Sequence, residues 1–354
     1  LDSEHKFTLF FTQQEAASEW RVKNTKADIV LARPTQPLLR IPCVIPWLAW
    51  RTGIDLLHVQ YVGPPFISVP LVTAIHDISY ERYPEFFSRR EVMQFRATIP
   101  RTARKANKVL TISECSKRDL VEMYGLSEQK VQVIYLGVGP EYKPLPVTYD
   151  KQHVLDKYGI NGRYFIAVGN LQPRKNLVRL IEAYTRMRND QPEIKTKLVI
   201  VGKKAWKHHP ILAIIKQSRW SEDIILTGYV PKADLPVLYA GSDGLIYPSI
   251  YEGFGLPPLE AMACGAPVVV SDRSSLPEVV GDAGIKINPF DTDAIAAALV
   301  LLALEPELSR RLSTAGIIRA SEFTWSKCAR ETLAVYEEVY RQTKSAKGTR
   351  TTSQ

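Results

Sequence analysis

Short apolar strand patterns alternate with helical patterns along the chain, and this alternation constrains the fold more than any other feature. A first series of strands is predicted at residues 6–11, 28–32, 56–60, 71–75, 108–112 and 131–134. A second series follows at 164–168, 197–201, 224–227, 244–247, 267–271 and 285–287. Helical patterns separate them at 91–107, 116–124, 176–189, 210–219, 235–240, 257–263 and 291–304. Such alternation favours an α/β fold with parallel, doubly wound sheets.

Glycine and proline residues break this pattern at 135–150, which predicts a boundary between two domains. With 354 residues, the chain is also longer than one hydrophobic core usually serves. We expect an N-terminal domain over residues 1–145, a second domain over 146–330, and a C-terminal helix with a basic, disordered tail over 331–354. Ligands of doubly wound domains bind beyond the carboxyl ends of the strands, so a cleft between the two domains is the expected site.

The composition is that of an ordinary globular protein and indicates no membrane span. The longest apolar run, 294–304, has the length of a short core helix. Four scattered cysteines lack zinc or redox spacing and fit a reducing cytoplasm best. The chain begins with Leu1 rather than methionine, which is consistent with a natural start further upstream.

The formal net charge of +9 is unevenly distributed. Four of these charges come from the C-terminal tail, which has no acidic residue after Glu338. The stretch 88–108 holds seven cations against Glu91 alone, and these are Arg89, Arg90, Arg96, Arg101, Arg104, Lys105 and Lys108. This stretch suits an anionic membrane surface or an anionic substrate, or it is simply a solvated helix face. Nucleic acid is not expected, because no binding motif accompanies the charge.

Prolines make residues 33–46 a poor candidate for regular structure. Trp47 and Trp50 follow at a helical i, i+3 spacing. Such a pair is more often part of a core than a membrane anchor.

The stretch 247–265 reads as a strand, a glycine-rich loop and a helix. Gly253 and Gly255 permit close backbone approach, and two prolines suit the first helical turn. Free amides and the helix dipole at such a turn favour an anion. Glu252 in the loop and Glu260 in the helix add two acceptors, an arrangement that suits a sugar diphosphate.

A second phosphate-binding pattern lies at 168–177, again a strand, a glycine and a polar loop that opens a helix. Arg174 and Lys175 precede the helix and could neutralise a diphosphate without a metal ion. The alternative is a pair of exposed cations, although cations at a helix start oppose the dipole. Gly202 and the corner 228–231 also follow strands and could read a nucleotide base through backbone groups.

The first series of strands contains three further candidate site residues, His76, Asp77 and Ser113. His76 follows the strand at 71–75, where a parallel sheet would point it towards a ligand. Asp77 either orients His76, contacts an acceptor or stabilises a turn. Ser113 opens a helix, and an N-cap role explains it equally well.

Together these motifs resemble the retaining family-four glycosyltransferases, which have the two-domain GT-B fold. The resemblance covers about residues 6–340 and rests on the stretches 252–260, 169–176 and 75–77. It implies two Rossmann-like domains that face each other across a cleft. In the second domain it implies that Glu252 binds donor sugar hydroxyls, that Glu260 binds the ribose, and that Arg174 and Lys175 bind the diphosphate.

The resemblance implies further contacts of the donor with the same two loops and with the first domain. The donor would also meet the backbone of Gly253, Phe254, Gly255 and Leu256 and the turn at Gly169 and Asn170. His76 would meet the donor sugar near the reacting centre, with Asp77 and Ser113 on the acceptor side. The family implies a front-face reaction in which the leaving diphosphate helps to deprotonate the acceptor. No cofactor or metal ion is expected, since no Asp or His cluster has ligand spacing.

The sequence departs from the family pattern in two places. Family members begin with a strand and a glycine-rich loop before the segment that matches residues 6–11, and these are missing from this sequence. Asn170 stands where many relatives have arginine, which leaves phosphate binding to Arg174 and Lys175.

We therefore expect a cytoplasmic, peripherally membrane-bound hexosyltransferase. It would move mannose from GDP-mannose to a glycan or lipid-linked acceptor, with residues 89–108 as the membrane contact. A non-catalytic nucleotide-sugar-binding protein, an inactive truncated fragment and a soluble sugar synthase are the alternatives.

Overall fold

The computed structural model describes residues 4–23, 27–146 and 148–351. The chain forms two compact units. The first contains residues 1–112, 116–134 and 326–354, and the second contains 113–115 and 135–325. The chain passes from the first unit to the second at residue 135, which is the start of the expected linker at 135–150.

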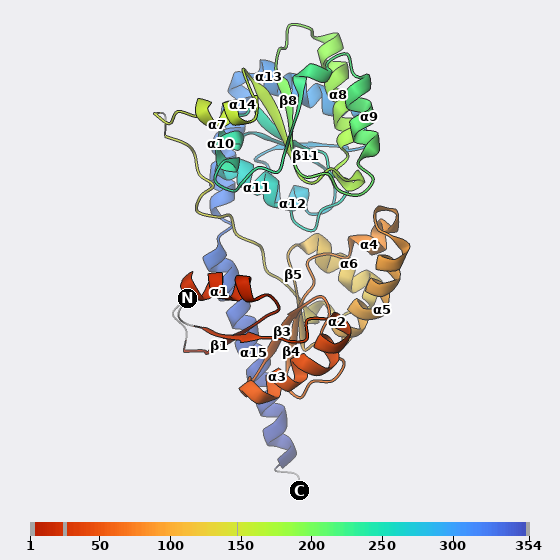
Figure 1. Cartoon of the computed structure of the whole chain (residues 1–354), viewed down its shortest axis with the longest axis vertical. Coiled ribbons are helices and arrows are strands. Elements are labelled where there is room, and N and C mark those ends of the chain that lie inside the picture. The colour runs from red at the N-terminus through yellow and green to blue at the C-terminus, as the bar shows by residue number, and fades with distance from the viewer. Residues whose placement is uncertain (1–3, 24–26, 147, 352–354) are drawn as a thin grey trace. The chain divides into compact units, whose positions relative to one another are not determined.

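The N-terminal unit contains a four-stranded parallel sheet in the order β3-β4-β5-β6 (Figure 1). The strands are β3 (Leu57–Gln60), β4 (Leu71–Ala74), β5 (Lys108–Thr111) and β6 (Val131–Val133). A separate parallel pair is formed by β1 (Phe7–Phe11) and β2 (Ala27–Leu31). The helical segments are α1 (Gln14–Lys23), α2 (Pro37–Leu39), η1 (Arg40–Val44), α3 (Ile45–Thr52), α4 (Ser79–Arg82), η2 (Pro84–Phe86), α5 (Arg89–Lys105), α6 (Glu114–Tyr124) and η3 (Glu128–Lys130).

The basic stretch forms α5, which begins with a capping box. Ser88 accepts a hydrogen bond from the backbone of Glu91, and the Glu91 carboxylate accepts one from the backbone of Ser88. Val92, Ile99 and Ala103 are buried on one side of the helix. The cations of α5 are exposed, and two of them also contact the rest of the unit, since Arg96 pairs with Glu81 at 2.7 Å and Arg104 donates to the carbonyl of Tyr124 at 3.3 Å.

The expectations of irregular structure at 33–46 and of a buried Trp47–Trp50 pair are both wrong. Residues 37–52 form one continuous helical segment, α2–η1–α3. Pro37 takes the first helical position, where a missing N–H is tolerated, and the π-helical turn Arg40–Val44 accommodates a further proline. Trp47 is 48% exposed and Trp50 is 76% exposed, because Leu48 and Ala49 form the buried side of α3.

The C-terminal unit contains a six-stranded parallel sheet in the order β12-β11-β10-β7-β8-β9. Its strands are β7 (Tyr164–Val168), β8 (Lys197–Val201), β9 (Ile224–Gly228), β10 (Gly244–Tyr247), β11 (Val268–Ser271) and β12 (Ile285–Ile287). The helical segments are α7 (Gln152–Lys157), η4 (Pro173–Lys175), α8 (Leu177–Asp190), α9 (His209–Gln217), η5 (Ser221–Asp223), α10 (Leu235–Ala240), α11 (Leu256–Ala263), α12 (Leu276–Val280), α13 (Thr292–Leu304) and α14 (Pro306–Ser321). The prediction of parallel, doubly wound α/β sheets is confirmed.

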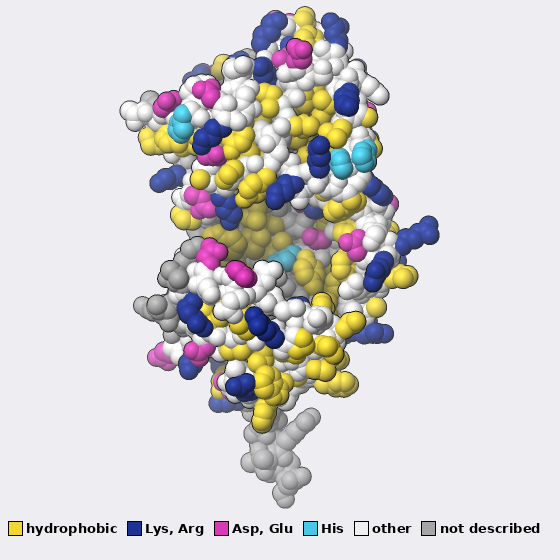
Figure 2. Space-filling view, viewed as in Figure 1, with side chains coloured by type: hydrophobic (Ala, Val, Ile, Leu, Met, Phe, Trp, Pro, Cys, Tyr) yellow, Lys and Arg dark blue, Asp and Glu magenta, His cyan; other side chains and the backbone are white. Residues whose placement is uncertain are grey.

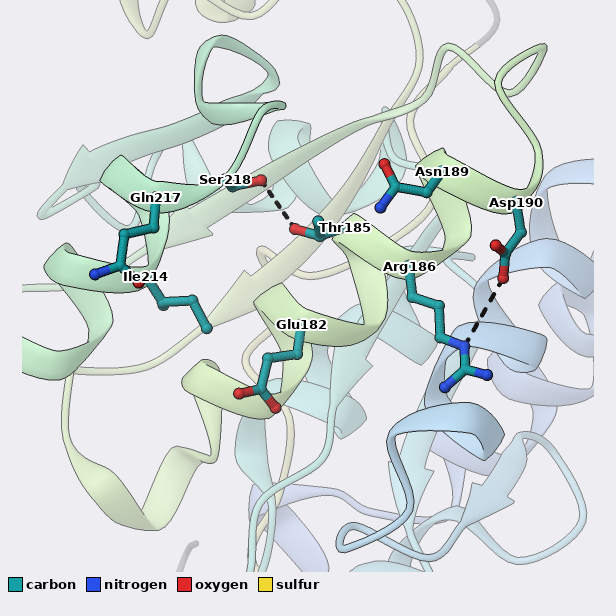
Figure 3. A pocket seen from close by; sticks show the side chains of 8 residues that line it. All are labelled: Glu182, Thr185, Arg186, Asn189, Asp190, Ile214, Gln217 and Ser218. Carbon is teal, nitrogen blue, oxygen red and sulfur yellow. Dashed lines mark hydrogen bonds and ion pairs between the residues drawn. The ribbon is translucent and has the colours of Figure 1, made fainter.

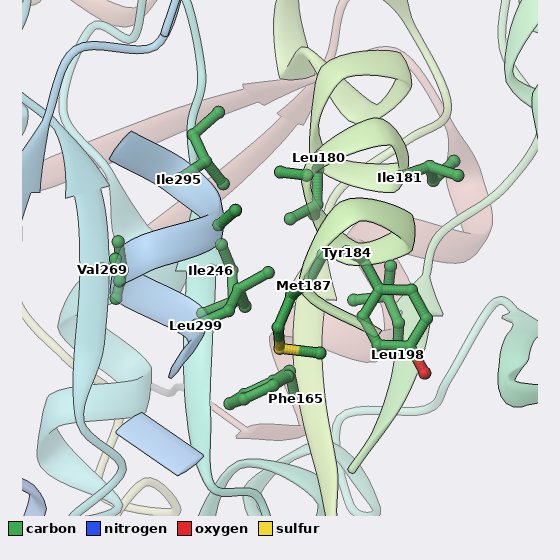
Figure 4. Close-up of a cluster of buried hydrophobic side chains, with 14 of the residues drawn as sticks. Phe165, Leu180, Ile181, Tyr184, Met187, Leu198, Ile246, Val269, Ile295 and Leu299 are labelled. Carbon is green, nitrogen blue, oxygen red and sulfur yellow. The ribbon is translucent and has the colours of Figure 1, made fainter. Parts of the chain in front are cut away.

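The core of the C-terminal unit lies between this sheet and the helices α8 and α13. Leu180, Tyr184 and Met187 of α8 pack with Ile295 and Leu299 of α13 (Figure 4). The strands contribute Phe165, Leu198, Ile246 and Val269 to the same cluster. Because strands of this sheet are covered on both faces, they are continuous apolar runs, which is why the sequence predicts them well.

The last helix, α15 (Trp325–Thr351), belongs largely to the N-terminal unit. Val335 and Val339 of α15 pack against Val72 of β4 and Leu110 of β5. The expected disordered tail is therefore helical up to Thr351, and residues 352–354 lie outside the described residues. Across the described part of the chain, every helix is too short or too polar to span a membrane.

Candidate functional site

The two predicted phosphate loops meet at the carboxyl edge of the C-terminal sheet. One loop follows β7 and the other follows β10, and these two strands are hydrogen-bonded neighbours in the sheet. The chain leaves β7 towards β8 on one side, while β10 continues towards β11 on the other. This is the topological switch point of the sheet, where open α/β folds bind ligands.

Glycine is required where the loops after β7 and β8 approach each other. A Cβ atom on Gly202 would lie 2.1 Å from the carbonyl oxygen of Gly169, and a Cβ on Gly169 would lie 2.8 Å from Cε of Lys175. Gly169 also has a φ of +146°, a conformation that side chains disfavour. Its missing side chain lets Lys175 fold back over the end of β7, with Asn170 exposed beside it.

Arg174, Lys175 and Glu252 form a buried ionic cluster between the two loops. Arg174 Nη1 donates to Glu252 Oε2 at 3.0 Å, and Lys175 Nζ donates to Glu252 Oε1 at 2.7 Å. Arg174 also donates to the carbonyl of Tyr251 at 2.9 Å, and Lys175 donates to the hydroxyl of Tyr247. We call this set the Glu252 cluster. Residues 77 positions apart in the sequence are thus brought into direct contact.

The Glu252 cluster joins one carboxylate to two cations in a site with little access to water. The exposed fractions of the side chains are 8% for Glu252, 11% for Lys175 and 20% for Arg174. Burial opposes ionisation of Glu252, but the charges of Lys175 and Arg174 outweigh it and lower the pKa of this carboxyl. Burial lowers the pKa of Lys175, although Glu252 offsets part of this effect. The cluster contains two cations and one carboxylate, a composition that suits an anionic ligand.

Hydrogen bonds fix the position of the loop that carries Glu252. Its backbone N–H donates to Ser274 Oγ at 3.0 Å, and Ser275 Oγ donates to the carbonyl oxygens of Glu252 and Phe254 at 2.9 and 2.7 Å. Gly255 then turns the chain into α11 with a φ of +116°. This φ lies in the left-handed region that favours glycine, and Leu256 is the first residue of the helix.

Glu260 lies in the middle of α11, and its Oε2 accepts a hydrogen bond from the hydroxyl of Tyr239 at 3.0 Å. Burial raises the pKa of Glu260, against the opposing effect of that hydrogen bond. The two glutamates therefore have different environments, since Glu252 is held ionised by cations and Glu260 is bound to a tyrosine.

In the N-terminal unit, His76 follows β4 after one residue, Ile75. Ser113, which is grouped with the second unit, directly precedes α6. The imidazole of His76 packs against the ring of Tyr61, with 5.6 Å between centroids. Within the described residues, the buried Nδ1 of His76 has no hydrogen-bond partner. Burial lowers the pKa of His76, against the opposing charge of Asp77, and this favours the neutral imidazole. Asp77 itself accepts a hydrogen bond from the backbone of Ser79 at 2.9 Å, which supports a turn role.

Three contributors to these sites are missing from the sequence prediction. Tyr247 lies under the Lys175 ammonium, 4.6 Å from ring centroid to Nζ. Tyr61 contacts His76, and Ser275 holds the Glu252 loop. Tyr61 and Tyr247 stand at the ends of parallel strands, so the rule that places ligands at strand ends is the signal that could have found them.

A surface cavity of about 580 Å³ lies between α8 and α9, well along α8 from the Glu252 cluster (Figure 3). Thr185 and Ser218 hydrogen-bond across its floor at 2.9 Å, and Arg186 is paired with Asp190 and Asp293. Its charged groups are paired with each other or exposed to solvent, so we assign the cavity no function. In the part of the chain that the structure describes, no three His, Cys, Asp or Glu side chains converge as metal ligands.

Two Rossmann-like units, one with a cationic cluster at its switch point, define the class of GT-B glycosyltransferases. Comparison with known proteins agrees. The sequence profile of glycosyltransferase family 4 matches residues 4–142, and the profile of glycosyl transferases group 1 matches residues 150–319. The chain belongs to this glycosyltransferase family.

Curated relatives support the same family. The chain is 34% identical to O-antigen chain mannosyltransferase B of Escherichia coli over 82% of its own length and 76% of that protein. It is 29% identical to the serotype-specific mannosyltransferase WbdA of E. coli over 64% of its length, and this match spans 28% of that longer protein. Among solved structures, a glycosyltransferase from Rickettsia africae ESF-5 superposes with a TM-score of 0.74 at 18% identity, covering 95% of this chain and 90% of that one.

Proposed function

We propose that the protein is a retaining mannosyltransferase that uses GDP-mannose and extends a glycan or lipid-linked acceptor. The observation that carries this proposal is the Glu252 cluster, in which two buried cations face one carboxylate at the switch point of the sheet. A diphosphate would compensate the excess positive charge. The choice of mannose is supported by the names of relatives that are 29% and 34% identical.

In the proposed reaction the bond between C1 of mannose and the diphosphate oxygen breaks, and the acceptor oxygen bonds to C1 on the same face. The acceptor proton passes to the departing diphosphate. Arg174 and Lys175 stabilise the charge that develops on this leaving group. Glu252 and the loop 253–255 hold the sugar hydroxyls, and the neutral imidazole of His76 hydrogen-bonds the donor sugar. The reaction requires no metal ion, so EDTA should leave the transfer rate unchanged.

The nucleotide base is proposed to bind at the corner that follows β9. Tyr229 is 62% exposed there, and the Lys203 ammonium lies 4.6 Å from its ring centroid. The loop after β8, which carries Lys203, joins this corner to the Gly169 loop: the backbone N–H of Leu171 donates to the carbonyl of Lys203 at 2.9 Å, and the N–H of Gly202 donates to the carbonyl of Gly228 at 2.9 Å. An exposed aromatic ring offers a stacking surface to a purine.

The cations of α5 are proposed to attract an anionic membrane at its cytoplasmic face. Arg89, Arg90 and Arg101 are exposed. Each cation near an anionic surface contributes about 1 kcal/mol to binding. The double variant Arg101→Glu/Arg104→Glu should therefore sediment less with phosphatidylglycerol vesicles, and unchanged sedimentation would contradict this role.

Calorimetry with GDP-mannose, UDP-glucose and ADP-glucose, followed by a transfer assay with the preferred donor, tests the proposal. GDP-mannose should bind most tightly and should be turned over with the sugar configuration retained. Binding without turnover would instead identify a non-catalytic nucleotide-sugar-binding protein. Preference for a uridine donor would contradict the assignment of GDP-mannose.

A further inference from the structure

The helical segment α2–α3 carries a large apolar surface that faces solvent. Leu38 and Leu39 are 89% and 53% exposed, and Trp47 and Trp50 are 48% and 76% exposed. Figure 2 shows hydrophobic side chains gathered over α2 and α3, with Lys and Arg side chains next to them. We call the four residues the Trp47–Trp50 surface. Apolar residues on an ordinary protein surface are scattered singly. Four large exposed apolar side chains on one short segment depart from that pattern.

The segment α2–α3 has apolar residues on two sides. One side is buried against the rest of the unit, and the Trp47–Trp50 surface is the other. Val44 and Leu48 pack against Ala32, Phe10 and Val30 of the same unit. Packing within the unit therefore explains Val44 and Leu48, but it does not explain why the opposite side is also apolar. A helix that is apolar on both sides is typical of a segment buried between two environments.

The charged residues of the chain segment that carries the Trp47–Trp50 surface all have one sign. No acidic residue occurs between Asp28 and Asp55, while this stretch contains Arg33, Arg40 and Arg51. The Arg51 guanidinium lies 5.0 Å from the centroid of the Trp47 ring. Arginines beside exposed indoles can keep their charge at a headgroup while their stems and the rings enter a less polar layer.

We propose that the Trp47–Trp50 surface inserts into the interfacial layer of an anionic lipid membrane. This rests on the proposed function, because a lipid-linked acceptor would be presented at such a membrane. A second copy of the chain is a poorer occupant, since a symmetric contact would bring Arg40 and Arg51 of one copy near those of the other without an acid nearby. The surface differs in kind from α5, whose cations adsorb to headgroups but bring few apolar groups.

The test uses the full chain with vesicles of equal parts phosphatidylglycerol and phosphatidylcholine, and with vesicles of phosphatidylcholine alone. Binding is measured by sedimentation, and insertion by quenching of tryptophan fluorescence with brominated acyl chains. The variants are Trp47→Ser/Trp50→Ser, and Trp47→Phe/Trp50→Phe, which keeps the apolar area. Trp206→Ser is the matched control, because Trp206 is also 48% exposed but lies in the C-terminal unit.

The wild type and Trp206→Ser should bind the anionic vesicles and be quenched. The serine variant should bind them about tenfold or more weakly, because it loses two inserted rings, and the phenylalanine variant should keep binding but lose most quenching. Equal binding and quenching of all four proteins would overturn the proposal. Self-association that the serine variant abolishes, without vesicle binding, would also overturn it and identify a second copy as the occupant.

Transfer of mannose to a water-soluble acceptor separates this inference from the proposed function. The serine variant should transfer at the wild-type rate, since Trp47 and Trp50 lie outside the donor-binding residues. Absence of transfer in every protein, together with the expected vesicle results, would refute the mannosyltransferase proposal and leave the membrane-inserting surface supported.

Discussion

Glu252 pairs with two cations, Arg174 and Lys175, and the proposed donor site of the C-terminal unit depends on its charge. In Glu252→Ala, Arg174 and Lys175 would face each other without a carboxylate. Removing one partner of a buried ion pair typically costs about 3–5 kcal/mol. We expect the free energy of unfolding to fall by this order and mannosyl transfer to be lost.

GDP provides the check on that variant. Because the diphosphate would take the place of the missing carboxylate, GDP should raise the melting temperature of Glu252→Ala more than that of the wild type. An equal or smaller rise in the variant would show that the cations do not meet the diphosphate.

Lys175 gives the proposed donor site a pH dependence. Its ammonium form binds the anion, and burial lowers its pKa from the usual 10.5. The site therefore holds its full charge below the lowered pKa and loses it as the pH rises through that value. GDP affinity should decline at a lower pH than an ordinary lysine would allow.

Lys175→Arg is the control for this pH effect, because arginine stays protonated in this range. Calorimetry of GDP binding from about pH 7 to pH 10 should show an alkaline loss of affinity in the wild type and none in Lys175→Arg. The same alkaline loss in both proteins would assign it to another group.

At the scale of elements, the crossing of the loops after β7 and β8 requires Gly202. A Cβ at this position would lie 2.1 Å from a backbone oxygen that cannot move aside as a side chain could. Gly202→Ala should therefore lower the midpoint of urea unfolding more than Gly228→Ala. Gly228 is the matched control, since it ends the neighbouring strand, also has positive φ, and has open space around its Cβ position. Equal losses would show that only backbone strain matters.

The sequence predicts the strands of both sheets within about two residues, and the reason is physical. Buried parallel strands such as β7 and β8 are unbroken apolar runs, and glycines mark their ends. The segment α2–α3 escapes prediction because proline is read as a helix breaker, while Pro37 sits where its missing N–H does no harm. The i, i+3 spacing of Trp47 and Trp50 predicts that both side chains lie on the same side of one helix. It does not determine whether that side faces the core or the solvent.

The candidate site is predicted in its residues but not in its contacts. The sequence marks Arg174, Lys175 and Glu252 as ligands of a donor, the two cations from one loop and the glutamate from another. Their direct ion pairing depends on β7 and β10 being neighbours, and strand order is not encoded in any local pattern. The partners of Glu260 and His76, which are Tyr239 and Tyr61, are likewise set by tertiary packing.

At the scale of the whole molecule, the chain returns to its N-terminal unit through α15. Val339 of this helix is 1% exposed and packs on β4 and β5. Val339→Ala removes two buried methyl groups and should destabilise the N-terminal unit by roughly 2 kcal/mol. Glu337→Ala on the same helix breaks only a half-exposed pair with His5 and should change little.

Hydrogen exchange can locate this effect within the molecule. In Val339→Ala the amides of β4 and β5 should exchange faster, while those of β7 and β10 should not change. Faster exchange throughout both units would contradict the assignment of α15 to the N-terminal unit.

The most direct test of the central claim, that the Glu252 cluster binds the donor diphosphate, compares GDP with guanosine. Calorimetry gives the affinity of both ligands for the wild type and for Lys175→Met, which keeps most of the side-chain volume. Loss of a hydrogen bond to a charged group should weaken GDP binding roughly tenfold to a hundredfold and leave guanosine binding unchanged. An equal effect of the substitution on both ligands would place the diphosphate elsewhere and contradict the account.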